Sequence, residues 1–367
     1  MADPRLVKLA DILVNYSLKI QPGEWVVVTG NIVAEPLMVE VLRAITKSGG
    51  HVNLLTGSDS LTETFLREAN EEQLKWVSPA LELVYNKVNA LMSIDGTSNT
   101  RTLSNIDPSK DQIRGVAHSE LMKTFMRRMA EKELRWVGTQ YPCPAFAQEA
   151  DMSLTEYEDF VFGTTFADKD DPIVEWNRIH DEQQVIVDWL KGKKTVTVKS
   201  PDADITLSIA GRDFINSDGR RNMPSGEIYT SPIEDSANGW VNFTYPAIRA
   251  GREVEGVRLE FKDGKVVDAS AKKNEAYLLS QLDSDEGARY LGEFAIGTNY
   301  GITKFTKSIL YDEKIGGSFH MAVGAGFPEV GGTNTSSIHW DFICDIQQDS
   351  EIRVDGELLY KDGQFQI

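Results

Sequence analysis

Residues 25–56 read WVVVTGNIVAEPLMVEVLRAITKSGGHVNLLT, and the order of patterns in this stretch predicts the fold of the first half of the chain. Residues 25–29 form a short apolar run of strand character, and residues 35–47 have the spacing of a helix that ends at two glycines. Residues 51–56 then supply a second strand-like run. A strand, a helix and a strand in this order are typical of an α/β layer with a parallel sheet.

The same alternation continues on both sides of this stretch. The residues that follow Asp3 have the spacing of an amphipathic helix, with Asp3 available as its N-cap. Further apolar runs, separated by helical stretches, occur at residues 81–85, 90–94 and 134–138. Gly30 lies between a strand and a helix, but no Gly-x-Gly-x-x-Gly or Walker sequence surrounds it, so we interpret it as a simple turn.

The pattern changes near residue 192. Beyond that point short strands dominate, together with Asp-Gly pairs of the kind that close hairpins. These pairs are Asp218-Gly219, Asp263-Gly264, Asp355-Gly356 and Asp362-Gly363. We therefore predict an α/β protein with an N-terminal α/β domain at residues 1–192, whose sheet is largely parallel, and a mixed, β-rich C-terminal domain at residues 193–367.

Composition and charge narrow the class of protein. The 367 residues are 41% hydrophobic and 26% charged, which is ordinary for globular domains. A formal charge of -18 repels a nucleic-acid backbone, so nucleic acid is not an expected partner. Two widely separated cysteines indicate neither a disulfide framework nor a thiolate zinc site. With no secretion signal and no run of ~20 apolar residues, we expect a cytoplasmic protein without membrane contact.

The second half of the chain holds the candidate metal ligands. In His339-Trp340-Asp341 the histidine and the aspartate are two positions apart, so on a strand both would point to one face. An imidazole and a carboxylate on one face suit a divalent cation. On its own, such a triplet is more often a surface pair or a hydrogen-bonded core histidine.

His320, Glu227 and Glu293 also have unusual surroundings. His320 closes a short run that contains two glycines, and each glutamate follows a glycine and adjoins apolar residues. A carboxylate drawn into a protein interior is costly unless it is paired or bound to metal. Taken singly, a satisfied core histidine and capping or surface glutamates are the more common explanations.

Four motifs occur in order within the second half. They are Pro224-Ser-Gly-Glu227, Leu291-Gly-Glu-Phe-Ala-Ile-Gly-Thr-Asn299, Asp312-Glu-Lys-Ile-Gly-Gly-Ser-Phe-His320, and Gly331-Gly-Thr-Asn334 through His339-Trp-Asp341. Together they resemble the thermophilic metallo-aminopeptidase family, of the aminopeptidase T and aminopeptidase S type. The resemblance is specific over residues 222–343, while the N-terminal half agrees in general character only.

The resemblance implies a metal-dependent aminopeptidase that releases N-terminal amino acids from short peptides. It implies a homodimer with two divalent ions per chain (zinc, cobalt, manganese or magnesium), held in the C-terminal domain by Glu227, Glu293, His320, His339 and Asp341. Glu293 would bridge the metals, a metal-activated hydroxide would attack the peptide carbonyl, and Glu293 or Glu227 would carry the proton. Family members commonly have a tyrosine seven residues after the first histidine, where this chain has Phe327.

Three other interpretations fit parts of the pattern. A mononuclear iron ring-cleaving dioxygenase, of the related dihydroxypyridine dioxygenase type, would use only His320, His339 and Asp341. A catalytically impaired binding homologue would be consistent with Phe327. In a purely structural barrel, Glu227 and Glu293 would be ordinary surface acids, and the substitution Glu293→Gln would leave activity intact.

Overall fold

The computed structural model of the chain describes residues 3–249 and 251–367, which divide by their internal contacts into two compact units. Unit 1 runs to Glu175 and takes in Gly219–Pro224, and unit 2 comprises Trp176–Asp218 and Ser225–Ile367. This division falls within helix α10 (Pro172–Leu190), whereas the boundary expected at residue 192 follows that helix. A domain boundary at residue 192 stays a prediction.

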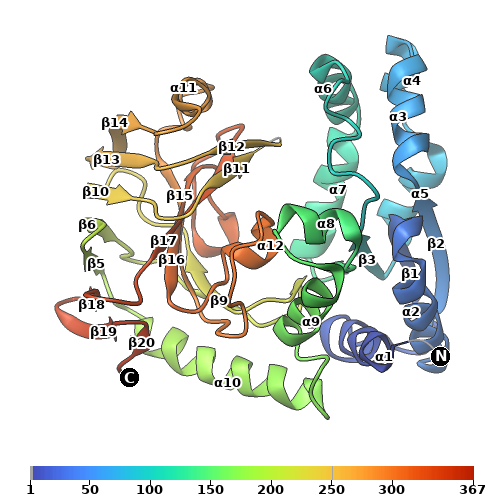
Figure 1. Cartoon of the computed structure of the whole chain (residues 1–367), viewed down its shortest axis with the longest axis horizontal. Helices are drawn as coiled ribbons and strands as arrows, with labels where there is room; N and C mark the ends of the chain where they lie inside the picture. Colours follow the sequence, from blue (N-terminus) through green and yellow to red (C-terminus); the bar gives the residue numbers. More distant parts are fainter. Residues whose placement is uncertain (1–2, 250) are drawn as a thin grey trace. The chain divides into compact units, whose positions relative to one another are not determined.

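Unit 1 is built on a five-stranded parallel sheet with the strand order β2-β1-β3-β4-β8, and the helices of the same unit lie beside it (Figure 1). The strands are β1 (Trp25–Asn31), β2 (His51–Gly57), β3 (Ala90–Asp95), β4 (Arg135–Gln140) and β8 (Asn222–Met223). The helices are α1 (Pro4–Asp11), continued by a π-helix (Ile12–Ser17), α2 (Glu35–Lys47), α3 (Asp59–Glu68), α4 (Glu71–Lys75), α5 (Pro79–Lys87), α6 (Pro108–Ala117), α7 (Ser119–Ala130), α8 (Pro144–Glu149) and α9 (Leu154–Thr164), with a 3-10 turn at Ile32–Ala34.

The predicted parallel sheet is confirmed, and one predicted strand is wrong. Strand β1 has Val26, Val27 and Val28 fully buried, as expected for a parallel strand that is covered on both faces. The run at residues 81–85 lies in helix α5 instead of a strand. A five-residue apolar run does not distinguish the two states, and Pro79 at the first turn favours the helix.

Unit 2 contains two antiparallel sheets, a two-stranded ribbon and short helices, so the predicted β-rich second half is confirmed. The eight-stranded sheet has the order β14-β13-β10-β6-β5-β18-β19-β20, with β5 (Thr195–Ser200), β6 (Ala203–Ser208), β10 (Asn238–Asn242), β13 (Arg258–Lys262), β14 (Lys265–Ser270), β18 (Glu351–Val354), β19 (Glu357–Lys361) and β20 (Gln364–Phe365). The five-stranded sheet has the order β17-β16-β15-β9-β7, with β7 (Ile215–Ser217), β9 (Glu227–Thr230), β15 (Leu291–Gly297), β16 (Ser318–Gly324) and β17 (His339–Asp345). The ribbon pairs β11 (Ala247–Arg249) with β12 (Arg252–Val254), and the remaining elements are the part of α10 from Trp176 onward, α11 (Glu275–Leu282), α12 (Ile309–Asp312) and a 3-10 turn (Pro328–Val330).

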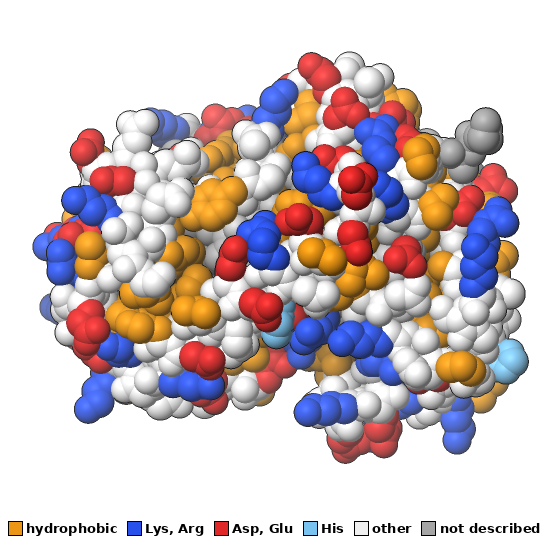
Figure 2. Space-filling model, turned by 90° about the horizontal axis from the view of Figure 1, so that it is seen from below, with side chains coloured by type: hydrophobic (Ala, Val, Ile, Leu, Met, Phe, Trp, Pro, Cys, Tyr) orange, Lys and Arg blue, Asp and Glu red, His pale blue; other side chains and the backbone are white. Residues whose placement is uncertain are grey.

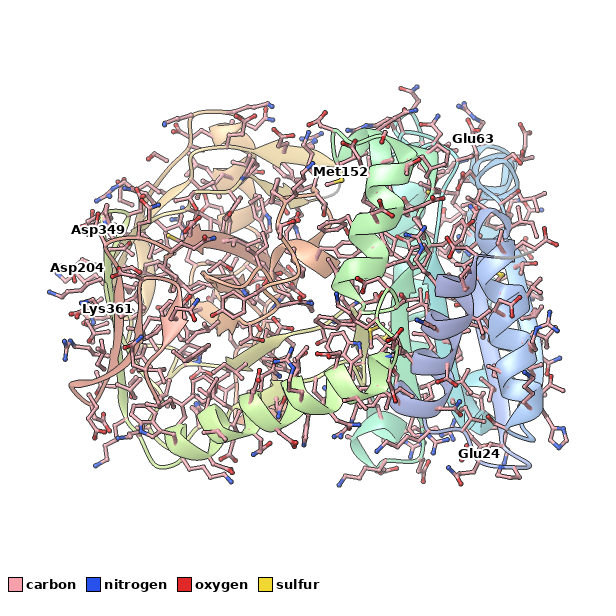
Figure 3. All side chains as sticks on the ribbon, turned by 60° about the horizontal axis from the view of Figure 1, so that its bottom comes forward. Glu24, Glu63, Met152, Asp204, Asp349 and Lys361 are labelled. Atoms are coloured by element: carbon pink, nitrogen blue, oxygen red, sulfur yellow. The ribbon has the colours of Figure 1, made fainter. Side chains whose placement is uncertain are left out.

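One hydrophobic core joins the two sheets of unit 2. Val198 and Leu259 from the eight-stranded sheet belong to the same buried cluster as Phe294, Met321 and Phe342 from the five-stranded sheet. On its other side the eight-stranded sheet carries exposed charged side chains (Figure 3). One face of the five-stranded sheet packs against this core, and its second face does not belong to the core.

The surface bears charges of both signs. On the face shown in Figure 2, lysine and arginine side chains lie among the acidic ones. Within residues 3–249 and 251–367, no helix has the length and apolar character needed to cross a membrane.

Candidate metal centre

The second face of the five-stranded sheet carries the polar residues predicted from the sequence. Side chains alternate along a strand, so Trp340 and Phe342 of β17 join the core while His339 and Asp341 point to the opposite face. In β16, Phe319 and Met321 likewise belong to the core, and His320 between them does not. The same alternation in β9 places Ile228 in the core and Glu227 on the other face.

Strand pairing brings these positions together. Asp341 lies opposite Ala322 of β16, and Ala322 lies opposite Glu293 of β15. The register of β15 shifts between Leu291 and Glu293, which lets both Leu291 and Phe294 reach the core while Glu293 faces away from it. Glu293 and Asp341 therefore share the face that carries His320.

The five predicted residues meet at contact distances. His320 Nε2 lies 3.5 Å from Glu227 Oε2 and 3.5 Å from Glu293 Oε1. His339 Nε2 lies 3.2 Å from Glu293 Oε2 and 3.4 Å from Asp341 Oδ1. Glu293 thus stands at the centre and presents a different oxygen to each histidine.

Several of these buried polar atoms have no hydrogen-bond partner. The atoms are Glu227 Oε2, both ring nitrogens of His320, and Asp341 Oδ1. An unpaired polar group in the interior is costly, so unpaired atoms of neighbouring ligand-type residues, such as His320 Nε2 and Glu227 Oε2 at 3.5 Å, indicate a bound group that satisfies them. Carboxylate oxygens and imidazole nitrogens are the donors that zinc and similar divalent cations accept. The donor set therefore fits a metal.

The donors form two groups that share one residue. Glu227, Glu293 and His320 offer ligand atoms that lie within 4.8 Å of one another, and Glu293, His339 and Asp341 do the same. His339 Nδ1 donates a hydrogen bond of 2.8 Å to the Ala325 carbonyl, which fixes the ring and leaves Nε2 directed at the cluster.

Two residues beside the cluster escaped the sequence analysis. Glu313 forms a third group of possible ligands with His320 and Asp341. Lys314 is fully buried, forms an ion pair with Glu313, and places its Nζ 3.6 Å from Glu227 Oε1. Both lie inside a motif that the sequence had already singled out, but adjacent charged residues are usually solvated, so nothing in the pattern marked them as buried.

The clustered charges shift the pKa values of their neighbours. Burial alone lowers the pKa of His320, but the carboxylates of Glu293 and Glu227 outweigh it and raise the pKa to about 9. His339 is raised in the same way to a pKa of about 11, through Asp341 and Glu293. Burial raises the pKa of Glu313 to about 8, although Lys314 opposes the shift. Without metal, the neighbouring carboxylates therefore favour the protonated form of both histidines.

Aromatic side chains flank the cluster. The ring of Phe327 lies 5.1 Å from that of His339 and 5.1 Å from that of Tyr229, measured between centroids. The Tyr229 hydroxyl lies 2.9 Å from Glu329 Oε1. Phe327 therefore packs directly against a predicted metal ligand.

Known proteins resemble this chain over nearly its whole length. A family model described as thermophilic metalloprotease (M29) matches residues 2–365. Aminopeptidase 2 of Geobacillus stearothermophilus is 28% identical, and Aminopeptidase T of Thermus thermophilus is 26% identical, each over 98% of this chain and 95% of the relative. The solved structure of wild-type AmpT from Thermus thermophilus superposes with a TM-score of 0.86 at 23% identity and covers 99% of both chains. The fold is therefore the same as that of AmpT.

Proposed function

This chain belongs to the thermophilic metalloprotease family (M29) and is a peptidase, and from that premise we propose that it is an aminopeptidase that releases N-terminal amino acids from short peptides with two divalent metal ions. The observation that carries the proposal is the position of Glu293. Its two oxygens face two separate histidines, and Glu293 forms one group of possible ligands with His320 and another with His339.

The proposed ligands follow from these groups. Glu227, Glu293 and His320 would hold one ion, and Glu293, His339 and Asp341 the other, with Glu293 shared. Zinc, cobalt, manganese and magnesium all suit this mixture of oxygen and nitrogen donors. Ions bound here would lower the pKa of a water molecule towards neutrality and polarise the peptide carbonyl.

The protein side chains would supply the remaining steps. Glu293 or Glu227 would accept the proton of the attacking water and deliver it to the leaving amine. The excess of carboxylates around His320 and His339 favours a cationic group, such as the free α-amine of a peptide. Recognition of that amine would restrict cleavage to the first peptide bond.

The dioxygenase alternative is not favoured. A mononuclear iron site needs two histidines and one carboxylate, which His320, His339 and Asp341 would satisfy. Glu227 and Glu293 would then be buried carboxylates without a role, at a considerable desolvation cost. Their burial beside His320 supports a second metal instead.

The proposal also covers the oligomeric state of the protein and its cellular compartment. We propose a homodimer that acts in the cytoplasm, as the family resemblance and the two unpaired cysteines suggest. Light scattering of the purified protein tests the assembly, since a mass of one chain would contradict the dimer.

Metal analysis together with an aminopeptidase assay tests the catalytic proposal. We expect two divalent ions per chain and release of leucine from leucyl peptides with at least one of the four metals. The substitution Glu293→Gln should lower kcat/KM by more than about 100-fold, because even outer partners of metal ligands are worth 10- to 100-fold. Glu260→Gln, an exposed glutamate on β13, is the matched control and should change little. One iron per chain with oxygen uptake on a hydroxypyridine would contradict the proposal.

A further inference from the structure

A small cavity adjoins the metal centre within unit 2. It measures about 160 Å³, and Asp341 and Ile343 of β17 form part of its wall. Pockets for whole drug-sized ligands span roughly 300–1,000 Å³. This cavity is too small for such a ligand and suits a single amino-acid side chain.

Ile343 lines the cavity and also lies next to the proposed metal ligands. Its neighbours Phe342 and Cys344 belong to the hydrophobic core, so Ile343 points to the opposite face, as Asp341 does. Ile343 also lies directly opposite His320 on the adjacent strand β16. Directly opposed residues have Cβ atoms about 4.5–5.5 Å apart, so a group held in the cavity lies next to the ligand cluster.

The other apolar walls come from two neighbouring segments. Ala247 and Ile343 are each only 4% exposed and form the deep part of the cavity. Phe305 is fixed by stacking on Tyr245 at 5.3 Å between ring centroids. Ile309, which is 49% exposed, lies at the mouth.

Three charged residues line the cavity, and each has a neighbouring partner or a proposed ligand role. Asp312 accepts hydrogen bonds from the backbone nitrogen of Thr306 at 2.7 Å and from its hydroxyl at 2.9 Å. Lys307 Nζ lies 4.0 Å from Glu253 Oε2. Asp341 belongs to the ligand cluster. The other six residues of the wall, Pro246, Ala247, Ile248, Phe305, Ile309 and Ile343, are all apolar.

We propose that this cavity receives the side chain of the substrate's N-terminal residue and selects apolar side chains of about the size of leucine. This inference rests on the proposed aminopeptidase function. The free amine and the scissile carbonyl both belong to the N-terminal residue, so when both lie at the ligand cluster its side chain is the one that reaches Ile343. The side chain of the second residue starts one peptide unit further away.

Two substitutions at Ile343 test the assignment. Aminoacyl 4-nitroanilides vary the first residue with a constant leaving group, and Leu-X dipeptides vary the second. Ile343→Ala enlarges the cavity and should shift preference from leucine towards phenylalanine, whereas Ile343→Phe should shift it towards alanine. We expect each ratio of kcat/KM to change by at least about tenfold, because one methylene in such a pocket is worth roughly 10- to 200-fold.

Two further variants separate selectivity from folding. Ile309→Ala changes an exposed side chain at the mouth and should weaken leucine substrates while leaving alanine substrates unaffected. Ile296→Ala removes an isoleucine on the core face of β15 and should lower the Tm without a change in the size preference. Calorimetry with free leucine and free alanine on the cobalt-loaded protein adds a binding readout, in which Ile343→Phe should weaken leucine selectively.

The results of these experiments can contradict the cavity assignment without contradicting the proposed aminopeptidase function. A wild-type protein that hydrolyses leucyl substrates while every Ile343 variant keeps its preference would overturn the cavity assignment alone. A changed preference for the second residue of Leu-X, with the first unchanged, would also overturn it. A wild-type protein that cleaves no aminoacyl substrate with any of the four metals would overturn the aminopeptidase function, and the inference with it.

Discussion

Lys314 Nζ lies 3.6 Å from Glu227 Oε1, and the two side chains are buried together with 0% and 6% of their surface exposed. Lys314 also forms an ion pair with Glu313. Lys314 therefore forms ion pairs with two carboxylates, and one of these, Glu227, is a proposed metal ligand. We therefore expect Lys314 to stabilise the carboxylate-rich cluster when metal is absent.

The substitution Lys314→Met should destabilise the metal-free protein strongly. Removing one partner of a buried ion pair leaves an uncompensated charge and typically costs about 3–5 kcal/mol of unfolding free energy. Bound cations should recover part of that loss, because they neutralise the same carboxylates. Urea unfolding with chelator and with added metal measures both effects.

Lys273→Met is the matched control for this substitution. Lys273 also pairs with two glutamates, Glu253 and Glu255, but on the surface, where ion pairs contribute little. An equal loss of stability in the two variants would contradict the role given to Lys314.

Metal removal should lower the stability of the wild-type protein. A ligand that binds only the folded state adds about 2.7 kcal/mol at a free concentration of 100 times its Kd. Thermal unfolding with a chelator and with increasing cobalt or zinc should therefore show a rising Tm. Glu293→Gln should lose most of this rise because Glu293 belongs to both ligand groups, whereas Glu260→Gln should keep it. If the Tm of the wild-type protein does not change with metal concentration, the proposed metal site is contradicted.

The metal-free protein should lose stability as the pH rises from about 6.5 to 9. The folded pKa of His320 is raised from 6.5 to about 9 and that of His339 to about 11, while Glu313 is raised from 4.5 to about 8. In this range the folded state binds more protons than the unfolded state, so the free energy of unfolding falls with pH. The histidine contribution is complete below pH 6.5 and disappears as the pH passes the folded pKa values.

Metal-loaded protein is the control for this pH dependence. Cations replace the protons on the histidines, so the same pH series should give a much weaker slope. Chemical denaturation at each pH measures the free energy directly. A rise in stability between pH 6.5 and 9 in the chelated protein would contradict the assigned shifts.

Much of the fold was predictable because its signals are local. The strand, helix and strand at residues 25–56 appear as β1, α2 and β2 with bounds close to those expected. The two-residue strand β8 was not predictable, since Asn222 and Met223 pair with β4 across a long stretch of chain. Such pairing depends on tertiary contacts that no local pattern encodes.

The candidate site was predictable in part by local reasoning. Alternation along a strand was enough to place His339 and Asp341 on one face. Glu227, Glu293 and His320 join them through the antiparallel pairing of four strands and a register shift in β15, which spacing alone does not give. The resemblance to a family supplied those three positions, and it did not supply Glu313 or Lys314.

Phe327 should hold His339 in position for metal binding. The centroid of its ring lies 5.1 Å from that of the His339 imidazole, and the His339 side chain is 30% exposed. Phe327→Ala removes this contact and should weaken metal binding by about 2- to 10-fold, because an aromatic pair contributes roughly 0.5–1.5 kcal/mol. Phe327→Tyr keeps the ring, so metal affinity should stay near that of the wild-type protein. Competition with a chelating dye measures the affinity.

Phe365→Ala is the matched control, because this aromatic residue of unit 2 packs on Tyr360 and contacts none of the proposed ligands. Phe327→Tyr also adds a hydroxyl at the position where the family commonly carries one, so its kcat tests whether Phe327 limits turnover. A higher kcat with unchanged metal content would show that it does. Loss of metal in Phe327→Tyr as severe as in Phe327→Ala would contradict the positioning role, since the aromatic contact with His339 would then be irrelevant to binding.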